Sequence, residues 1–269
     1  MNLQTVTIGQ YYPGQSVLHR MDPRTKITGV FLLSIAIFLP KVWLGYLLTA
    51  LFSLTALALS QVPVRFILRG LKPILIFLGI TIVLNLFLTP GDPILKLGRF
   101  SITREGLVLS GVATFRLLLL VMSASLLTLT TSPIRLTDGL ERMLRPLEPI
   151  GVPAHEIALM MTIALRFIPT LIEEADRIIR AQMARGADFQ SGNLLKRVGG
   201  LIPVMVPLFV AAFRRADELA TAMEARGYRG GKGRTRMKEL AFTRVDLVAG
   251  SALIGFTGLL IWLRAIGWG

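Results

Sequence analysis

The chain has 269 residues, 53% of them hydrophobic, and its 30 basic against 16 acidic residues give a formal net charge of +14. So apolar a composition excludes an ordinary soluble domain and indicates an integral membrane protein. Because no cysteine is present, disulfides, thiolate metal sites and a cysteine nucleophile are excluded.

Five apolar segments are candidate membrane-spanning helices. In chain order they are Ile27–Leu39, Val42–Leu59, Pro73–Thr89, Gly106–Thr131 and Leu247–Leu263. A span needs roughly 20 apolar residues, with about 17 as the usual lower limit, so the first segment is short. Either it begins nearer Arg24 or it enters only part of the bilayer, and Pro40-Lys41 is expected to form the turn to the second segment.

Two further apolar runs, Ile157–Ile172 and Val198–Phe213, are interpreted as amphipathic helices on the cytoplasmic face. If both crossed the bilayer, Glu173–Arg197 would lie outside with five basic residues. Lys and Arg in short loops favour the cytoplasmic side, which disfavours that alternative.

The distribution of basic residues predicts the orientation. We expect the N-terminus, Gln61–Lys72 and Ser132–Arg244 to lie on the cytoplasmic side, because together they hold most of the 30 basic residues. The remainder are Lys41, Lys96, Arg99, Arg104 and Arg264 outside and Arg116 within a span. Acids are interspersed among the bases of Ser132–Arg244, a mixed surface that argues against nucleic acid as a partner.

The predicted fold is an all-α integral membrane protein with about five transmembrane helices and a cytoplasmic domain of long amphipathic helices. Residues 1–131 would form the N-terminal segment and four spans, residues 132–244 the cytoplasmic domain, and residues 245–269 the last span. The glycine-rich, basic segment Gly227–Lys238 is expected to be a flexible tether to that span.

A twelve-residue pattern occurs twice in the predicted cytoplasmic domain. The segment from Ala175 to Gly186 returns 41 positions later as Ala216–Gly227, six of the twelve positions match, and both copies end in Ala-Arg-Gly. Each glycine is expected to adopt the left-handed conformation that ends a helix. Capping alone explains one such end, but it does not require the matching alanines and aspartate of the second.

The repeated helix ends are therefore candidate docking sites for two similar partners. The alanines three residues apart, Ala181 with Ala184 and Ala222 with Ala225, lie on one helix face and allow a partner to approach closely. The following arginine can bind a carboxylate or backbone carbonyls.

No catalytic, cofactor or metal site is predicted. A phosphate-binding loop around Gly231-Lys232 fails, because Arg226 takes the position of its first glycine and Gly233 that of its hydroxyl residue. His155-Glu156 begins like a zinc-protease helix, but Leu159 stands where the second histidine is required.

A few polar residues near or within the spans have simpler interpretations. Arg116 is expected to pair with protein groups or to contact a partner subunit, and Asn85 to form a hydrogen bond between helices. His19, Asp22 and Arg24 are interpreted as a local cap and a cytoplasmic anchor before the first span.

At these motifs the chain resembles the transmembrane (T) component of energy-coupling factor transporters, importers related to ABC transporters. The resemblance rests on the two ends Ala184-Arg185-Gly186 and Ala225-Arg226-Gly227, on the N-terminal stretch Gly9–Lys26 (GQYYPGQSVLHRMDPRTK), and on the order of the parts. It covers nearly the whole chain, and the paired motif is specific to the family.

The resemblance implies a non-catalytic subunit without a cofactor. In this family the T component links two ABC ATPase subunits to a substrate-binding membrane protein, the S component, for vitamin or metal-ion uptake. By that likeness the two arginine-tipped helices are coupling helices, with Arg185 and Arg226 docking to the ATPases and Ala184, Gly186, Ala225 and Gly227 shaping the fit. It also implies a multi-pass protein of a bacterial or archaeal cell membrane, in contact with the lipid bilayer, with a cytoplasmic N-terminus.

Alternative functions are an intramembrane enzyme, a stand-alone carrier, and the T subunit of a dedicated cobalt, nickel or biotin system. An enzyme would need a metal motif or a nucleophile–base pair. A carrier usually shows repeated membrane halves and polar groups at midplane, whereas the repeat in this chain lies in the predicted cytoplasmic part. The dedicated system would use the same motifs, so it stays open.

Overall fold

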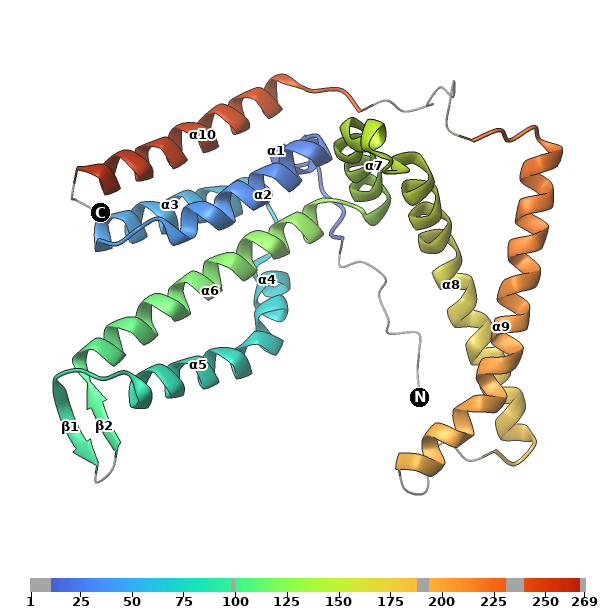
Figure 1. Ribbon diagram of the computed structural model, residues 1–269, viewed down its shortest axis with the longest axis horizontal. Helices are drawn as coiled ribbons and strands as arrows, with labels where there is room; N and C mark the ends of the chain where they lie inside the picture. Colours follow the sequence, from blue (N-terminus) through green and yellow to red (C-terminus); the bar gives the residue numbers. More distant parts are fainter. Residues whose placement is uncertain (1–10, 98–99, 188–193, 231–239, 267–269) are drawn as a thin grey trace. The chain divides into compact units, whose positions relative to one another are not determined.

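The computed structural model describes residues 11–97, 100–187, 194–230 and 240–266 (Figure 1). The chain divides into two compact units. The bundle unit comprises residues 9–139 together with residues 240–269, and the helix-pair unit comprises residues 140–239.

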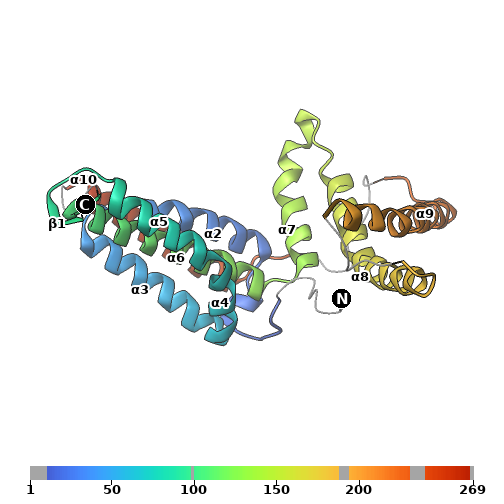
Figure 2. The ribbon, with the colours of Figure 1, turned by 90° about the horizontal axis from the view of Figure 1, so that it is seen from below.

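The bundle unit is built from long apolar helices that run side by side (Figure 2). These are α2 (Pro23–Phe38), α3 (Trp43–Ser60), α5 (Leu75–Leu88), α6 (Arg104–Thr130) and α10 (Arg244–Ala265). Shorter elements connect them: α1 (Val17–Arg20), α4 (Val64–Leu71), a 3-10 turn at Lys72–Ile74, and a hairpin of β1 (Pro93–Leu97) and β2 (Phe100–Thr103). The hairpin pairs antiparallel, with Pro93 opposite Thr103 and Leu97 opposite Phe100.

Helix α6 is the centre of the bundle, because it packs against α2, α3, α4 and α5. One buried cluster joins Leu33 and Ile37 of α2 to Leu119 of α6 and Leu253 of α10. The last long helix of the chain therefore packs against the first. Between α5 and α6 the backbones approach closely: a Cβ on Gly106 would come 2.7 Å from the carbonyl oxygen of Asn85.

Small hydroxyl residues fill much of the remaining interior. Thr49, Ser53 and Ser123 are at most 2% exposed. Most of these hydroxyls donate to carbonyls of their own helix, as in the 2.8 Å bond from Thr49 Oγ1 to the carbonyl oxygen of Gly45. Small residues that satisfy their own hydrogen bonds let helices pack closely where lipid replaces water, since burial of apolar surface then gives no driving force.

The outer surface of the bundle is apolar. Ile76 and Phe77 of α5 are 71% and 70% exposed. By length and composition, the described helices that are able to cross a membrane are Trp43–Ser60, Val64–Leu88, Arg104–Thr130, Ala154–Ala184 and Arg244–Ala265. The predicted all-α membrane protein is thus confirmed, and many exposed apolar side chains fit a bilayer as the surrounding solvent.

The structure differs from the sequence-based expectation in several elements. The helix that contains the first predicted span starts earlier than the apolar run, at Pro23, and its 16 residues remain short for a crossing. Within the segment Gln61–Lys72, expected on the cytoplasmic side, lies helix α4, and the connection between the third and fourth predicted spans contains the β-hairpin. Helix α8, expected to be cytoplasmic, is itself long and apolar enough to qualify as a span. Most of the proposed tether falls outside the described residues.

Helix α7 (Pro133–Leu144) contains the boundary between the two units, and the 3-10 segment Arg145–Ile150 belongs to the helix-pair unit. Its two long helices are α8 (Ala154–Ala184) and α9 (Leu194–Ala225), which continue through internal prolines at positions 169, 203 and 207. Figure 1 shows the two helices crossing each other.

Candidate functional site

The two helices of the helix-pair unit run antiparallel. Gln182 Nε2, near the end of α8, donates to the carbonyl oxygen of Pro203 at 3.3 Å. About two turns earlier in α8, Glu174 forms an ion pair with Arg215 of α9 at 3.4 Å. The helices therefore place the two Ala-Arg-Gly ends at opposite ends of the pair.

Each of these ends closes with the same hydrogen bonds. At the end of α8, the N–H groups of Gly186 and Ala187 donate to the carbonyls of Met183 and Gln182, both at 3.0 Å. At the end of α9, the N–H groups of Gly227 and Tyr228 donate to the carbonyls of Glu224 and Met223, at 2.9 and 3.0 Å. This pair of bonds is the Schellman motif, in which a left-handed residue satisfies the last carbonyls of a helix.

The glycines have the backbone conformation that the motif requires. The φ angle is +88° at Gly186 and +73° at Gly227. A side chain at such a φ meets the following carbonyl oxygen, which is why glycine is favoured at this position. The predicted helix-ending role of both glycines is confirmed.

The arginines before these glycines are exposed. All six residues of the two Ala-Arg-Gly ends are exposed, as are Ala181 and Ala222 one turn earlier. In the described part of the chain, neither Arg185 nor Arg226 has a hydrogen bond or ion pair through its guanidinium group. A cation here also lies beside the exposed carbonyls of a helix C-terminus, which stabilises its charge.

The separation of the two ends follows from helix geometry. The end of α8 is held at the level of Pro203 in α9 by the bond from Gln182. From residue 203 to residue 225, α9 rises about 33 Å at 1.5 Å per residue. The structure thus does not bring the two predicted sites together: it holds them apart as two separate copies.

A groove lined by both apolar and charged side chains lies between these ends, along α8 and α9. Its volume is about 920 Å³. It is lined by Phe167, Glu174, Val206, Pro207, Val210, Ala211, Arg214, Arg215, Glu218 and Leu219. Large apolar side chains beside it are exposed, including Phe209 at 57% and Phe213 at 70%. Such a surface is typical of a contact with a membrane or with another protein.

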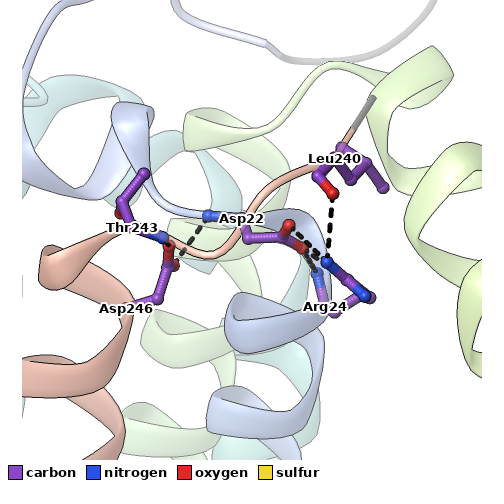
Figure 3. A network of polar contacts seen from close by, with 5 residues as sticks. All are labelled: Asp22, Arg24, Leu240, Thr243 and Asp246. Atoms are coloured by element: carbon purple, nitrogen blue, oxygen red, sulfur yellow. Dashed lines mark hydrogen bonds and ion pairs between the residues drawn. The ribbon is translucent and has the colours of Figure 1, made fainter. Parts of the chain in front are cut away.

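A second polar site, in the bundle unit, joins the N-terminal motif to the last helix (Figure 3). The carboxylate of Asp22 caps α2, accepting from the Arg24 backbone N–H at 2.9 Å and from Nε and Nη2 of Arg24 at 3.0 Å each. These hydrogen bonds to Asp22 raise the pKa of Arg24. The local cap predicted for this motif is confirmed.

The partner of this cap is Asp246, which sequence analysis missed. Its Oδ1 accepts from the backbone N–H of Asp22 at 2.8 Å. Its Oδ2 accepts from the N–H of Thr243 at 2.8 Å and from Thr243 Oγ1 at 2.6 Å, which forms a capping box at the start of α10. Arg24 completes the contact, with Nη2 3.5 Å from the Leu240 carbonyl oxygen and the guanidinium 4.1 Å from the centre of the Phe242 ring. An aspartate at the start of an otherwise apolar run was the signal available in the sequence.

Lys26 of the N-terminal motif connects the start of α2 to the end of α6. Lys26 is 7% exposed, and its Nζ donates to the carbonyl oxygen of Thr130 at 2.9 Å and to Thr131 Oγ1 at 3.0 Å. Burial, and next the nearby charge of Arg135, lower the pKa of this lysine from 10.5 to about 8. Lys26 precedes the apolar run of α2, so its charge marks the edge of the apolar part.

His19 fixes the turn before α2. Its Nε2 donates to the Tyr12 carbonyl oxygen at 2.9 Å, since that oxygen can only accept, and its Nδ1 forms a hydrogen bond with Ser16 Oγ at 2.6 Å. The ring also lies against Gly14, where a Cβ would come 2.8 Å from His19 Cε1. This contact explains the glycine of the Pro13-Gly14 motif.

Arg116 and Asn85 have structural partners. Nη2 of Arg116 donates to the carbonyl oxygen of Pro40 at 3.2 Å and to Tyr46 Oη at 3.0 Å. Arg116, in the candidate span α6, thereby supplies a hydrogen-bond donor to the carbonyl at the α2–α3 turn. This pairing with protein groups is one of the two options that sequence analysis expected. The predicted hydrogen bond of Asn85 between helices is wrong: Asn85 Nδ2 donates to the carbonyl oxygen of Thr81, one turn earlier in α5.

Among the described residues, no group of three or more His, Asp or Glu side chains is placed to hold a metal ion.

Comparison with known proteins identifies the family. The profile of the cobalt transport protein family, CbiQ, matches residues 14–237. The chain is 54% identical over 260 residues to the energy-coupling factor transporter transmembrane protein EcfT of Ruminiclostridium cellulolyticum, covering 96% of this chain and 97% of that protein. Proteins of the same name from Acidaminococcus fermentans and Bacillus subtilis are 51% and 47% identical over 267 and 264 residues, and the matches cover 99% and 98% of this chain and 98% and 100% of those proteins. With its long apolar helices and full-length similarity, the chain therefore belongs to the family of transmembrane components of energy-coupling factor transporters.

Proposed function

We propose that this chain is the non-catalytic subunit that couples two ABC ATPase subunits to a substrate-binding S component during vitamin or metal-ion uptake. ATP hydrolysis is assigned to the partner subunits. The observation that carries the proposal is a pair of helix ends that share the Ala-Arg-Gly sequence, the closing hydrogen bonds and an exposed arginine, and that lie at opposite ends of the helix pair.

The geometry of the ends favours two partners over one. A spacing of about 33 Å along α9 is too wide for a single groove on one partner to hold both arginines. Because the hydrogen bonds and exposure are the same at both ends, similar partner surfaces fit them equally well. We therefore assign one ATPase to Ala184-Arg185-Gly186 and the other to Ala225-Arg226-Gly227.

The groove and exposed apolar side chains of α8 and α9 are assigned to the S component. That assignment covers the exposed apolar side chains of this surface, whose contact with water would be unfavourable. The surface lies between the two ends, so movement of the ATPases is passed along α8 and α9 to the S component.

The proposed topology follows the basic residues of the bundle unit. The end formed by the N-terminal motif, α4 and the start of α10 carries Arg20, Arg24, Lys26, Arg65, Arg69, Lys72, Arg135 and Arg244. The positive-inside rule assigns this end, and with it the N-terminus and residues 132–244, to the cytoplasm. Residues 1–131 and 245–269 then form the membrane part.

Charge reversal tests the docking assignment. The double variant Arg185→Glu/Arg226→Glu, co-expressed with the ATPase subunits of its own genome, is expected to lose the ATPases on affinity purification in mild detergent. A carboxylate at a helix C-terminus costs only about 0.3–1 kcal/mol, so the helices themselves should remain folded, which circular dichroism would verify.

The matched control is Arg177→Glu/Arg180→Glu, which makes the same change in charge at exposed positions of α8 that precede the Ala-Arg-Gly end by one to two turns. The control should retain the ATPases and ATP-driven uptake. Normal assembly and uptake by the Arg185→Glu/Arg226→Glu variant would show the docking role to be wrong. Uptake assays with vitamins and with cobalt or nickel ions would separate a shared system from the dedicated metal system that the CbiQ profile also allows.

A further inference from the structure

Helix α4 uses one face to pack against the bundle. Ile67 is 3% exposed in a cluster with Val62, Leu126 and Leu129. A Cβ on Gly70 would come 3.1 Å from Ser125 Oγ of α6, so this face lies close to the central helix. These contacts fix the rotation of α4 about its axis.

The outward faces of α4 are of two kinds. Val64 and Leu68 form an apolar strip and are 56% and 58% exposed. Beside them lie Arg65, Arg69 and Lys72, which are exposed and share a face because they are spaced four and three residues apart. In the described part of the chain, none of these three basic side chains forms an ion pair.

The position of α4 in the chain places it at the membrane boundary. It follows α3, a candidate span that ends at Ser60, and it forms the first part of the candidate span Val64–Leu88, ahead of the apolar helix α5. At the 3-10 turn Lys72–Ile74, which contains Pro73, α4 turns away from the line of α5 (Figure 1). Three basic side chains are costly in hydrocarbon, and an exposed apolar strip is unfavourable in water. Both faces have a favourable environment only at the interface between the membrane and water.

We propose that α4 is an interfacial helix whose basic face binds the headgroups of anionic phospholipids. Val64 and Leu68 enter the acyl region, while Arg65, Arg69 and Lys72 contact phosphate oxygens, with the guanidinium groups as forked donors. The centre of the Arg69 guanidinium lies 5.6 Å from the Phe66 ring centre, which directs it over the helix surface. Lipid fits this surface better than an acidic protein, because the apolar strip and the basic face lie side by side on a helix flanked by membrane helices.

The chain offers a direct test because it has no native cysteine. A single Leu68→Cys substitution carries a fluorophore on the exposed apolar strip of the full-length protein, which is reconstituted in phosphatidylcholine nanodiscs. Quenching is compared between brominated phosphatidylglycerol and brominated phosphatidylcholine at the same mole fraction. Each base near an anionic surface contributes about 1 kcal/mol, roughly a fivefold preference. We therefore expect several-fold stronger quenching by phosphatidylglycerol, which decreases at high salt.

The triple variant Arg65→Gln/Arg69→Gln/Lys72→Gln should remove that preference. The matched control, Lys41→Gln/Arg104→Gln/Arg264→Gln, removes the same charge from exposed positions away from this end of the bundle and should keep it. Equal quenching of the native sequence by both lipids would overturn the proposal, as would equal loss of preference in the control. Absence of a lipid preference combined with protection of the probe by added partner subunits would assign the face to protein instead. The result does not depend on ATPase docking, because α4 is remote in the chain from both Ala-Arg-Gly ends and no partner subunit is present in the lipid measurement.

Discussion

Removal of the Asp246 carboxylate, which accepts a hydrogen bond from the backbone of Asp22, is predicted to destabilise the protein strongly. Asp246 is 3% exposed and accepts three hydrogen bonds from Asp22 and Thr243. Asp246→Ala leaves those donors unpaired at the start of α10. A hydrogen bond to a charged group contributes about 1.5–3 kcal/mol, and loss of an N-terminal cap costs about 0.5–2 kcal/mol. Since these contributions overlap, we expect a loss of about 3 kcal/mol.

Thermal unfolding in detergent, followed by far-ultraviolet circular dichroism, measures this loss. For a chain of this size, about 3 kcal/mol corresponds to a decrease in Tm of roughly 6–12 °C. Ser251→Ala is the control, because its exposed hydroxyl only donates to the carbonyl oxygen of Val248 in the same helix. If Asp246→Ala lowered the Tm no more than Ser251→Ala, the contact would contribute little and the reasoning would be refuted.

Two further predictions concern pH and the helix ends. The pKa of Lys26 is about 8 in the folded protein and near 10.5 in the unfolded protein. Between these two pH values the unfolded state binds more protons than the folded state. The free energy of unfolding should therefore rise with pH across that range. Chemical denaturation from pH 7.5 to 10 should show this rise, and Lys26→Met should remove Lys26's part of it; an unchanged profile in the variant would contradict the assignment. Gly227→Ala should cost about 1 kcal/mol because of its positive φ, whereas Gly250→Ala, inside α10 with no atom near its Cβ position, should stabilise by up to about 1 kcal/mol. The same sign for both substitutions in a Tm measurement would contradict the left-handed end.

Hydrophobicity and turn residues allowed much of the fold to be predicted. Four of the predicted spans correspond to α3, α5, α6 and α10 within a few residues, because a run of apolar residues suits lipid whatever its partners are. The prediction missed helix α4, whose side chains suit both water and the apolar interior of the membrane. Helix α4 combines basic and apolar faces within eight residues, so its average composition resembled that of a loop.

The candidate docking ends show the same division. The sequence alone identified Ala184-Arg185-Gly186 and Ala225-Arg226-Gly227 and predicted the left-handed glycines, because Schellman ends depend on local backbone geometry. It did not predict that the two ends lie at opposite ends of an antiparallel pair. That arrangement depends on contacts such as the bond from Gln182 to Pro203, which no local pattern encodes.

Sequence by itself thus determined that this protein belongs in a membrane, where its apolar helices lie in the chain, and which arginines end the repeated motif. These properties follow from composition and from interactions within a few residues. Only the tertiary structure decided that Asp246 pairs with the backbone of Asp22, 224 positions away, and that Arg116 satisfies the turn at Pro40. A buried polar group selects its partner by geometry in the folded state, so residues distant in the chain become neighbours only when the helices pack.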